Sequence, residues 1–122
     1  MKRGDVYDAR LDPIEGSEQG GIRPVIIVSR DAINASSTLV IAVPCTTYRS
    51  QRQLYPSQIL ITAPDGGLSR DSVGLGEQVR AVSKSRLLRF RGTLSQAAIA
   101  QLNKALLMAM DLPGQFDDEI DI

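Results

Sequence analysis

The sequence predicts a β-rich α+β domain, a small β-barrel followed by a C-terminal helix. Two runs of apolar, mostly β-branched residues, 25–28 and 39–43, are typical of buried strands. Shorter strand-like segments separated by turns favour a barrel over alternating β–α–β units. The length of 122 residues fits one domain with its own core. We expect that domain at residues 1–114, followed by an acidic, mobile tail at 115–122.

The first half of the chain contains three predicted strands. Residues 5–11 form a loose strand pattern, and residues 24–29 and 39–43 form the two apolar strands. Pro44 is expected to end the third of these strands. Residues 30–37 are polar and predict a loop or a single helical turn.

The second half contains shorter elements. Strands are predicted at residues 58–62, 72–76 and 78–82, with Glu77 between the last two. Residues 83–88 predict a short helix that Ser83 caps.

The clearest helix runs from about residue 95 to residue 112. Its start is capped either by Ser95 or by a capping box of Thr93 and Gln96, and Pro113-Gly114 ends it. The predicted core-facing arc contains Ala98, Ile99, Leu102, Ala105, Leu106, Ala109 and Met110. Leu107 and Met108 lie outside the arc, where we expect them to contact a second surface such as another subunit.

Histidine is absent, and Cys45 is the only cysteine. The sequence therefore excludes Ser-His-Asp and Cys-His catalysis and lacks the commonest metal ligand. The acids before residue 117 show no metal-ligand spacing, so we expect neither a metal site nor a cofactor. Cys45 follows a buried strand and a proline, which indicates a structural role. A single cysteine suits the cytoplasm, and no apolar run is long enough to cross a membrane.

The net charge of zero conceals an uneven distribution. Four acids lie among the last six residues, so residues 1–116 carry 14 bases against 10 acids. Eleven of the bases are arginine, which suits bidentate phosphate contacts. This mildly cationic body is compatible with a nucleic-acid partner but is only a weak indication of one.

The stretch from Gly16 to Arg30 joins a glycine-rich polar loop to a buried strand. Arg23 lies where the two meet, and a guanidinium in that position is a candidate anion site. The alternative is a structural ion pair at the barrel rim with one of three acids, Asp5, Glu15 or Glu18. Considered alone, these residues favour the ion pair.

Thr46 and Thr47 follow the strand 39–43, at the point where we expect it to reach the surface. A fixed hydroxyl there is a candidate for catalysis, although threonine hydroxyls often only satisfy a backbone group. The polar loop 48–57 comes next, with two tyrosines and two arginines. Aromatic rings beside cationic side chains are typical of surfaces that bind single-stranded nucleic acid, but two tyrosines in such a loop are also ordinary.

Arg23 and Thr46 together favour a reaction with an anionic transition state. One example is the phosphorane that forms when an RNA 2′-OH attacks the neighbouring phosphate, because two fixed donors would stabilise the developing charge. Their spacing in the sequence does not establish that the two side chains meet.

Residues 16–24 read Gly-Ser-Glu-Gln-Gly-Gly-Ile-Arg-Pro, after Lys-Arg-Gly-Asp-Val-Tyr at 2–7 and before Pro-Cys-Thr-Thr at 44–47. Further motifs lie at 70–80 and 83–87. Together they resemble the MazF/PemK family of toxin endoribonucleases, and the resemblance covers nearly all of the chain before the tail.

This resemblance implies an SH3-like β-barrel of the MazF/CcdB type with a C-terminal helix, assembled as a homodimer. It implies cleavage of single-stranded RNA at short sequences without a metal ion, leaving a 2′,3′-cyclic phosphate and a 5′-OH. It also implies a MazE-like antitoxin whose acidic, partly disordered segment occupies the RNA groove.

The family's catalytic arginine falls on Arg23 and its catalytic threonine on Thr46. Glu18 matches a functionally important glutamate, and Gln78 and Arg86 match positions associated with RNA contact. Residues within these motifs or directly after them complete the set of predicted RNA contacts: Ser17, Gln19, Thr47, Tyr48 and Arg49.

Two alternatives belong to other functional classes. One is a non-enzymatic toxin of the same barrel, like the gyrase poison CcdB. The other is a catalytically idle module that only binds an antitoxin. Arg23, Thr46 and the Gly-Ser-Glu-Gln loop argue against gyrase binding, which needs none of them.

Overall fold

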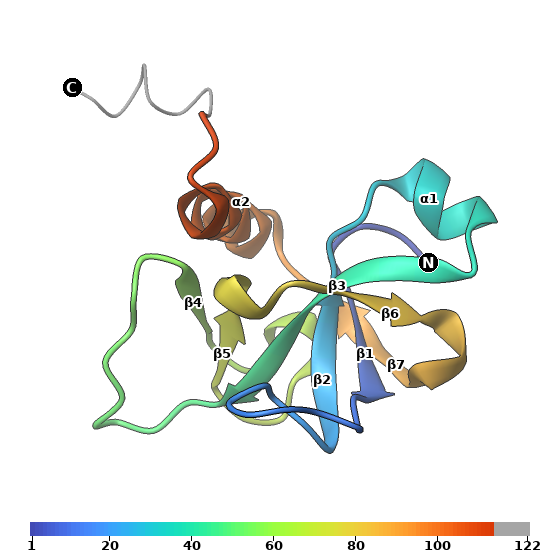
Figure 1. Cartoon of the computed structure of the whole chain (residues 1–122). Helices are drawn as coiled ribbons and strands as arrows, with labels where there is room; N and C mark the ends of the chain where they lie inside the picture. The colour runs from blue at the N-terminus through green and yellow to red at the C-terminus, as the bar shows by residue number, and fades with distance from the viewer. Residues whose placement is uncertain (114–122) are drawn as a thin grey trace.

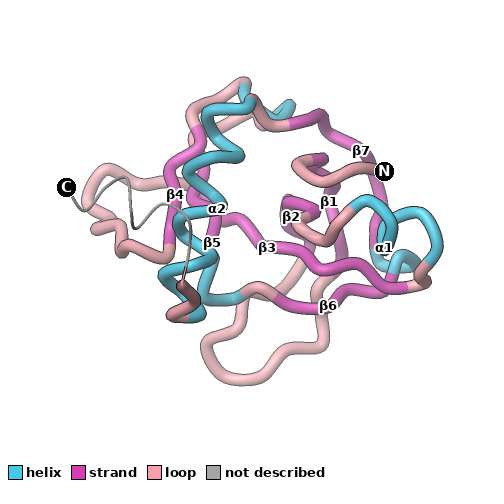
Figure 2. Tube along the Cα trace, turned by 90° about the horizontal axis from the view of Figure 1, so that it is seen from above, coloured by secondary structure: helices cyan, strands magenta, loops and turns pink. Residues whose placement is uncertain are grey.

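The computed structural model describes residues 1–113, so the acidic tail predicted at 115–122 lies outside the described part. Within it, seven antiparallel strands form a curved sheet with one long helix packed across it (Figure 1, Figure 2). The strands are β1 (Asp5–Arg10), β2 (Ile22–Ile27), β3 (Leu39–Thr47), β4 (Gln58–Ile61), β5 (Ser72–Leu75), β6 (Arg80–Ser83) and β7 (Leu87–Thr93). The helices are α1 (Asp31–Ser36) and α2 (Gln96–Met110), with 3₁₀ turns η1 (Asp65–Gly67), η2 (Gly76–Gln78) and η3 (Lys84–Arg86).

The sheet is barrel-like, as predicted, but it is not closed. Its strand order is β4–β5–β3–β2–β1–β7, and β6 pairs with the first half of β3. Within residues 1–113, β4 and β7 are the two ends of this order and do not pair with each other. The fold therefore keeps exposed strand edges, one of them along β7.

Two clusters of buried apolar side chains lie on opposite faces of the central strands. Successive strand residues point to opposite faces, so Ile26 and Val43 join the cluster beneath α2, while Val25 and Ala42 join the other. The predicted burial of β2 is confirmed, because Val25, Ile26 and Ile27 are inaccessible to solvent. Each such side chain stabilises the fold by about 1.5–3 kcal/mol relative to an exposed position.

The prediction that Pro44 ends the third strand was wrong. β3 continues to Thr47 because its second half pairs with β5, from Cys45 opposite Gly74 to Thr47 opposite Ser72. The strand is also less uniformly buried than its composition indicates. Leu39 and Ile41 are 49% and 40% exposed, since α2 covers only part of their face of the sheet.

The predicted strands at 72–76 and 78–82 are shortened by the 3₁₀ turn η2, which contains Gln78. Gly76, at the start of η2, lies against the backbone of the preceding loop. A Cβ at this position would lie 2.3 Å from the Ser57 carbonyl oxygen, so only glycine fits. The predicted short helix at 83–88 is the single turn η3, and Ser83 caps it as expected.

Ser95 caps α2, since its hydroxyl accepts a hydrogen bond from the Ala98 N–H at 3.2 Å. The alternative capping box does not form, because the Thr93 hydroxyl instead donates to the buried Asp5 carboxylate at 2.7 Å. The helix ends at Asp111, which adopts a left-handed conformation with φ of 53° before Pro113.

Four residues of the predicted arc are buried as expected: Ala98, Leu102, Ala105 and Leu106. Met110 was wrongly predicted to face the core, since it is 48% exposed at the rim of a groove beside the sheet. Met108 is 61% exposed and Leu107 is half-buried, which leaves both available to a second surface. Within residues 1–113, no helix is long and apolar enough to cross a membrane.

Cys45, which lies on β3 opposite Gly74 of β5, is fully buried, and burial raises the pKa of its thiol to about 12. The native protein should therefore resist iodoacetamide at pH ~8.5, where a free cysteine is half ionised. Because burial disfavours the thiolate, the folded protein is most stable relative to the unfolded chain while the thiol is protonated in both. The free energy of unfolding then falls as the pH rises from the ordinary thiol pKa toward 12. Mass spectrometry should find alkylation only after denaturation; rapid alkylation of the folded protein would contradict the burial.

Candidate functional site

The β2 and β3 strands separate at the end of the sheet that carries the predicted catalytic pair. Their pairing runs from Ile27 opposite Ala42 to Val25 opposite Pro44 and stops there. Proline has no N–H to donate, so Pro44 is a natural end for this ladder. Beyond it, β2 remains paired with β1 and β3 remains paired with β5.

Arg23 and Thr46 lie on the two sides of this separation. Continued at the same register, the ladder would set Arg23 opposite Thr46, two positions beyond the last pair. Cross-strand partners share a face of the sheet, so the two side chains are directed to the same side. The sheet thus places Arg23 on β2 and Thr46 on β3 on the two sides of this separation, where the two strand ends are not paired with each other.

The Arg23 side chain is held by the loop that precedes it. Its Nε donates to the Gly20 carbonyl at 3.0 Å. With the Gln19 amide oriented so that its oxygen faces the guanidinium, that oxygen accepts from Arg23 Nη2 at 3.0 Å and Nε at 3.1 Å. The expected alternative, an ion pair with Asp5, Glu15 or Glu18, does not form within residues 1–113. Arg23 Nη1 is left without a protein partner in this part of the chain.

Two further contacts fix the loop that holds Arg23, which projects from the lower end of β1 and β2 (Figure 1). The Gln78 side-chain carbonyl accepts from the Gln19 backbone N–H at 2.8 Å. The Asp12 carboxylate accepts from the Gly21 N–H at 3.1 Å, and φ of 75° at Gly21 explains why glycine is needed there. Gln78 therefore acts on Arg23 through Gln19.

The Thr46 side chain is half-buried and, within residues 1–113, its hydroxyl makes no hydrogen bond to another protein group. The alternative, in which the Thr46 hydroxyl only satisfies a backbone group, is therefore wrong for the described residues. Its neighbour Thr47 is also half-buried and pairs with Ser72 on β5. A hydroxyl held on a strand and free of protein partners is available to a ligand.

A cavity of about 350 Å³ adjoins the loop. Its lining combines two carboxylates, two amides, a guanidinium and one apolar side chain: Glu18, Glu77, Gln19, Gln78, Arg80 and Val79. Such a mixture of donors and acceptors suits a flat polar ligand that forms hydrogen bonds with the amides and packs its ring against Val79. Two predicted residues from the loop, Glu18 and Gln19, thus meet Gln78 in one place.

Other predicted residues lie at the surface around the site. Ser17 is exposed near the tip of the loop, and the Glu18 carboxylate accepts from the Glu15 N–H at 2.8 Å. Tyr48 and Arg49 begin the long loop between β3 and β4, directly after Thr47. The Tyr48 N–H donates to the carbonyl of Asp71, the residue before β5, at 2.9 Å, which holds the start of this loop beside β5.

Arg86 has a structural role that the sequence did not indicate. Its Nη1 donates to the Arg10 carbonyl at 3.1 Å and also to the Asp12 carbonyl, so it holds the end of β1 at the base of the loop. Its Nε and Nη2 have no partner within the described residues.

Three residues with a place at this site were not predicted: Asp12, Glu77 and Arg80. Asp12 anchors the loop, and Glu77 and Arg80 line the cavity. Glu77 and Arg80 belong to the motif at 70–80, in which only Gln78 was predicted as a site residue. Among residues 1–113, no group of three potential metal-ligating side chains comes together.

Sequence comparisons identify similar proteins over most of the chain. A model of PemK-like, MazF-like toxins of type II toxin–antitoxin systems matches residues 2–110. The chain is 38% identical to Endoribonuclease MazF9 of Mycobacterium tuberculosis over 117 residues, covering 92% of this chain and 98% of that protein. It is 41% identical to Endoribonuclease MazF of Staphylococcus saprophyticus over 112 residues, covering 92% of each.

Solved structures share the fold. An endoribonuclease in complex with its cognate antitoxin from a mycobacterial species matches with a TM-score of 0.77 and 28% identity, over 93% of this chain and 98% of that chain. MazF from Deinococcus radiodurans also matches with a TM-score of 0.77, over 91% and 96% of the two chains. Its identity of 24% supports the fold alone.

The contact between Gln78 and Gln19 predicts how the loop responds to substitution. Gln78→Ala removes the acceptor for the Gln19 N–H, so hydrogen exchange at that amide should accelerate. Gln78→Glu keeps an acceptor oxygen and should exchange at nearly the wild-type rate. Exchange measured by mass spectrometry over residues 12–22 tests this, with β4 as the internal reference. Equal exchange in Gln78→Ala and wild type would contradict the anchoring role.

Proposed function

The chain belongs to the PemK-like, MazF-like toxins of type II toxin–antitoxin systems, and we propose that it cleaves single-stranded RNA with Arg23 and Thr46 as its catalytic residues. It is an endoribonuclease, as its two named relatives are. The observation that carries the catalytic assignment is the separation of β2 from β3, with Arg23 and Thr46 on its two sides. The alternatives of a gyrase-binding toxin and an idle antitoxin-binding module lose their support, because neither describes these relatives.

The reaction that suits this pair is attack by an RNA 2′-OH on the adjacent phosphorus. A bond forms between the 2′-oxygen and phosphorus, the bond from phosphorus to the 5′-oxygen breaks, and the products carry a 2′,3′-cyclic phosphate and a 5′-OH. The Arg23 guanidinium and the Thr46 hydroxyl donate to the phosphoryl oxygens as the negative charge of these oxygens increases.

Proton transfer needs an acceptor for the 2′-OH proton and a donor for the 5′-oxygen. Neutral arginine is too rare at pH 7 to be an efficient base, so charge stabilisation is the role we assign to Arg23. The acceptor is a carboxylate, a water molecule or the phosphate itself. Glu18 and Glu77 are the carboxylates that line the adjacent cavity.

We propose that the cavity beside the loop binds a nucleotide base next to the cleaved phosphodiester bond. Base-specific contacts need donors and acceptors held in position, and the cavity offers both in Gln78 and Glu77. Glu77 is itself held by Ser57 Oγ at 3.1 Å and Gln58 Nε2 at 2.8 Å. Residues that flank this cavity on the two loops complete the proposed RNA contacts: Ser17, Glu18, Gln19, Thr47, Tyr48, Arg49 and Arg86.

We further propose that the chain acts as a homodimer joined through the groove between α2 and the β3–β6 face. This groove of about 900 Å³ is lined mainly by apolar side chains, among them Val28, Ile41, Leu106 and Met110. Such a wide apolar surface is unusual on a monomer and favours association with a second apolar surface.

An antitoxin neutralises this toxin, in keeping with the solved structure of a mycobacterial endoribonuclease in complex with its cognate antitoxin. The cationic balance of residues 1–116, with 14 bases against 10 acids, suits an acidic antitoxin segment. We place this activity in the cytoplasm, where its RNA substrate is made. Residues 1–114 form the proposed toxin domain, and 115–122 an appended tail.

Replacing the proposed catalytic groups should lower the cleavage rate without unfolding the protein. Arg23→Ala should reduce single-turnover cleavage at least about a hundredfold, the usual effect of removing one transition-state donor. Thr46→Val, which replaces the hydroxyl with a methyl group of similar size, should also reduce the rate. Arg30→Ala, at an exposed arginine that begins α1, is the matched control and should cleave normally. Unchanged cleavage by Arg23→Ala would reject the assignment.

The dimer can be tested at Ile41, which is 40% exposed in the groove and can be changed without disturbing the core. Ile41→Glu should convert the dimer to a monomer, because the interface would bury an unpaired charge. Light scattering coupled to size-exclusion chromatography measures the mass. Leu60→Glu, at a residue of similar exposure on β4, is the control and should leave the mass unchanged. A dimer that survives Ile41→Glu would place the interface elsewhere.

A further inference from the structure

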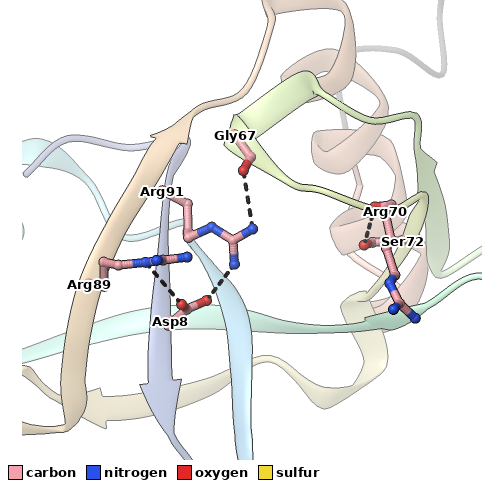
Figure 3. Close-up of polar contacts among 6 residues, drawn as sticks. All are labelled: Asp8, Gly67, Arg70, Ser72, Arg89 and Arg91. Atoms are coloured by element: carbon pink, nitrogen blue, oxygen red, sulfur yellow. Dashed lines mark hydrogen bonds and ion pairs between the residues drawn. The ribbon is translucent and has the colours of Figure 1, made fainter.

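Arg80, the first residue of β6, carries a guanidinium that has no partner within residues 1–113. Its side chain is half-buried, and neither an ion pair nor a side-chain hydrogen bond joins it to another described residue. Arg91 on β7 shows the contrast: its Nη1 lies 2.9 Å from the Asp8 carboxylate, and its Nη2 donates to the Gly67 carbonyl at 3.2 Å (Figure 3). Because partial burial of a charge without a partner is costly, the Arg80 guanidinium is a candidate for binding an anion.

The strand register directs Arg80 to the same face of the sheet as the proposed catalytic pair. Arg80 pairs with Ala42 on β3, and Ala42 pairs with Ile27 on β2. Thr46 is four positions from Ala42 on β3, and Arg23 is four positions from Ile27 on β2. Cross-strand partners share a face, and so do residues an even number of positions apart on one strand. Thr46 lies roughly 13 Å along β3 from the row that contains Arg80, a distance that a few nucleotides of extended RNA span.

The cavity of about 350 Å³ connects Arg80 with Arg23. Arg80 lines this cavity together with Gln19 and Gln78. The Gln19 side-chain oxygen accepts from Arg23 Nη2 at 3.0 Å, and the Gln19 backbone N–H donates to the Gln78 side chain at 2.8 Å. The two guanidiniums therefore belong to one polar surface, with the walls of the cavity between them.

The carboxylates of the cavity do not neutralise Arg80. Glu18 accepts from a backbone N–H of its own loop at 2.8 Å, and Glu77 accepts from Ser57 and Gln58. Neither glutamate lies within ion-pair distance of Arg80. Both are exposed, so solvent and salt screen their repulsion of an anion. The donors of the Arg80 guanidinium are thus available to a ligand that enters the cavity.

We propose that Arg80 binds a phosphate of the nucleotide whose base occupies the cavity. The inference rests on the proposed function and extends it to a phosphate that is not cleaved. A base enters the cavity with its own phosphates attached, and a guanidinium binds phosphate oxygens in a bidentate manner. Since phosphate contacts fix the position of a nucleic acid, Arg80 helps to align the RNA so that the neighbouring bond lies between Arg23 and Thr46.

This role affects RNA affinity more than the rate of the chemical step. The contact with an uncleaved phosphate is the same before and during the reaction, so it lowers the energy of the bound RNA and of the transition state equally. Replacing Arg80 should raise the RNA concentration that gives half-maximal cleavage and leave the rate at saturation nearly unchanged. Replacing Arg23 should instead lower the rate at saturation.

The binding test uses the full chain and a fluorescently labelled RNA of roughly 20 nucleotides that spans a mapped cut. The ribose on the 5′ side of the cut is 2′-deoxy, so that the RNA stays intact. If the wild type cuts no RNA, an oligouridylate of the same length takes its place. Arg80→Met keeps an unbranched stem and removes the charge, and fluorescence anisotropy should show roughly tenfold weaker binding, the loss expected for charge-assisted hydrogen bonds. The slope of log affinity against log salt should become less steep by ~0.7.

Two matched variants complete this measurement. Arg80→Lys keeps the charge and should retain the salt slope, with part of the affinity lost because lysine does not bind in a bidentate manner. Arg30→Met, at an exposed arginine directly before α1, should bind as the wild type does. The melting temperature of Arg80→Met should match or exceed that of the wild type, because no protein group loses a partner.

A second measurement identifies the phosphate. Each phosphate near the cut is replaced in turn by an uncharged methylphosphonate. One of these replacements should weaken binding to the wild type and have no further effect in Arg80→Met, while the others should affect both proteins alike. This coupling between one side chain and one phosphate would not arise if Arg80 were only structural.

Three results would overturn the proposal. They are equal RNA binding by Arg80→Met and the wild type, weaker binding with every methylphosphonate effect unchanged, and conversion of a dimer to a monomer by Arg80→Met. The last result would assign Arg80 to a contact with a second copy, since Arg80 also lines the groove of about 900 Å³. Failure of the proposed function would be seen separately, as wild-type protein that binds RNA but cleaves none.

Discussion

The proposed active site depends on one backbone constraint, the loss of pairing between β2 and β3 at Pro44. β3 serves two parts of the sheet: its first half pairs with β2 and β6, and its second half pairs with β5. Because proline cannot donate to the ladder, the strand can change partners at this point without leaving a buried N–H unsatisfied. The change of partner leaves Arg23, still paired with β1, and Thr46, still paired with β5, on the two sides of the separation between β2 and β3.

The loop before β2 then determines where the guanidinium points. Gln19 and Gly20 hold Arg23, while Gln78 and Asp12 hold the loop. Gln78 reaches the loop from η2, whose start at Gly76 fits only because it lacks a side chain. Residues from distant parts of the chain thus hold the Arg23 side chain in position. A donor that is held in position before the reaction is what electrostatic stabilisation of a transition state requires. The same contacts link the cavity, where we propose that a nucleotide base binds, to the position of the proposed catalytic group.

Much of this architecture can be predicted from the sequence, because hydrophobic periodicity and turn residues report directly on strands and helices. The apolar strands, the Ser95 cap and the buried stripe of α2 are confirmed. The exposure of Leu39, Ile41 and Met110 could not be predicted, since it depends on how far α2 extends over the sheet. The continuation of β3 beyond Pro44 was missed for a similar reason, because the strand is completed by pairing with β5.

The candidate site, like the fold, could be predicted from the sequence only in part. Arg23 and Thr46 were singled out as chemical groups, but their relation depends on a strand register that no local pattern encodes. Arg86 was predicted as an RNA contact, and the structure gives it bonds to the Arg10 and Asp12 carbonyls. Asp12, Glu77 and Arg80 were missed because an ordinary charged residue in a turn or strand has no signature of its own.

The most direct test of the account is cleavage of an RNA in which one ribose, on the 5′ side of a mapped cut, lacks its 2′-OH. The account predicts that this bond is no longer cut in the presence of EDTA, while unmodified RNA is cut to give a 5′-OH end. Cleavage of the modified bond at the normal rate would contradict it, because the nucleophile would then not be the neighbouring 2′-OH.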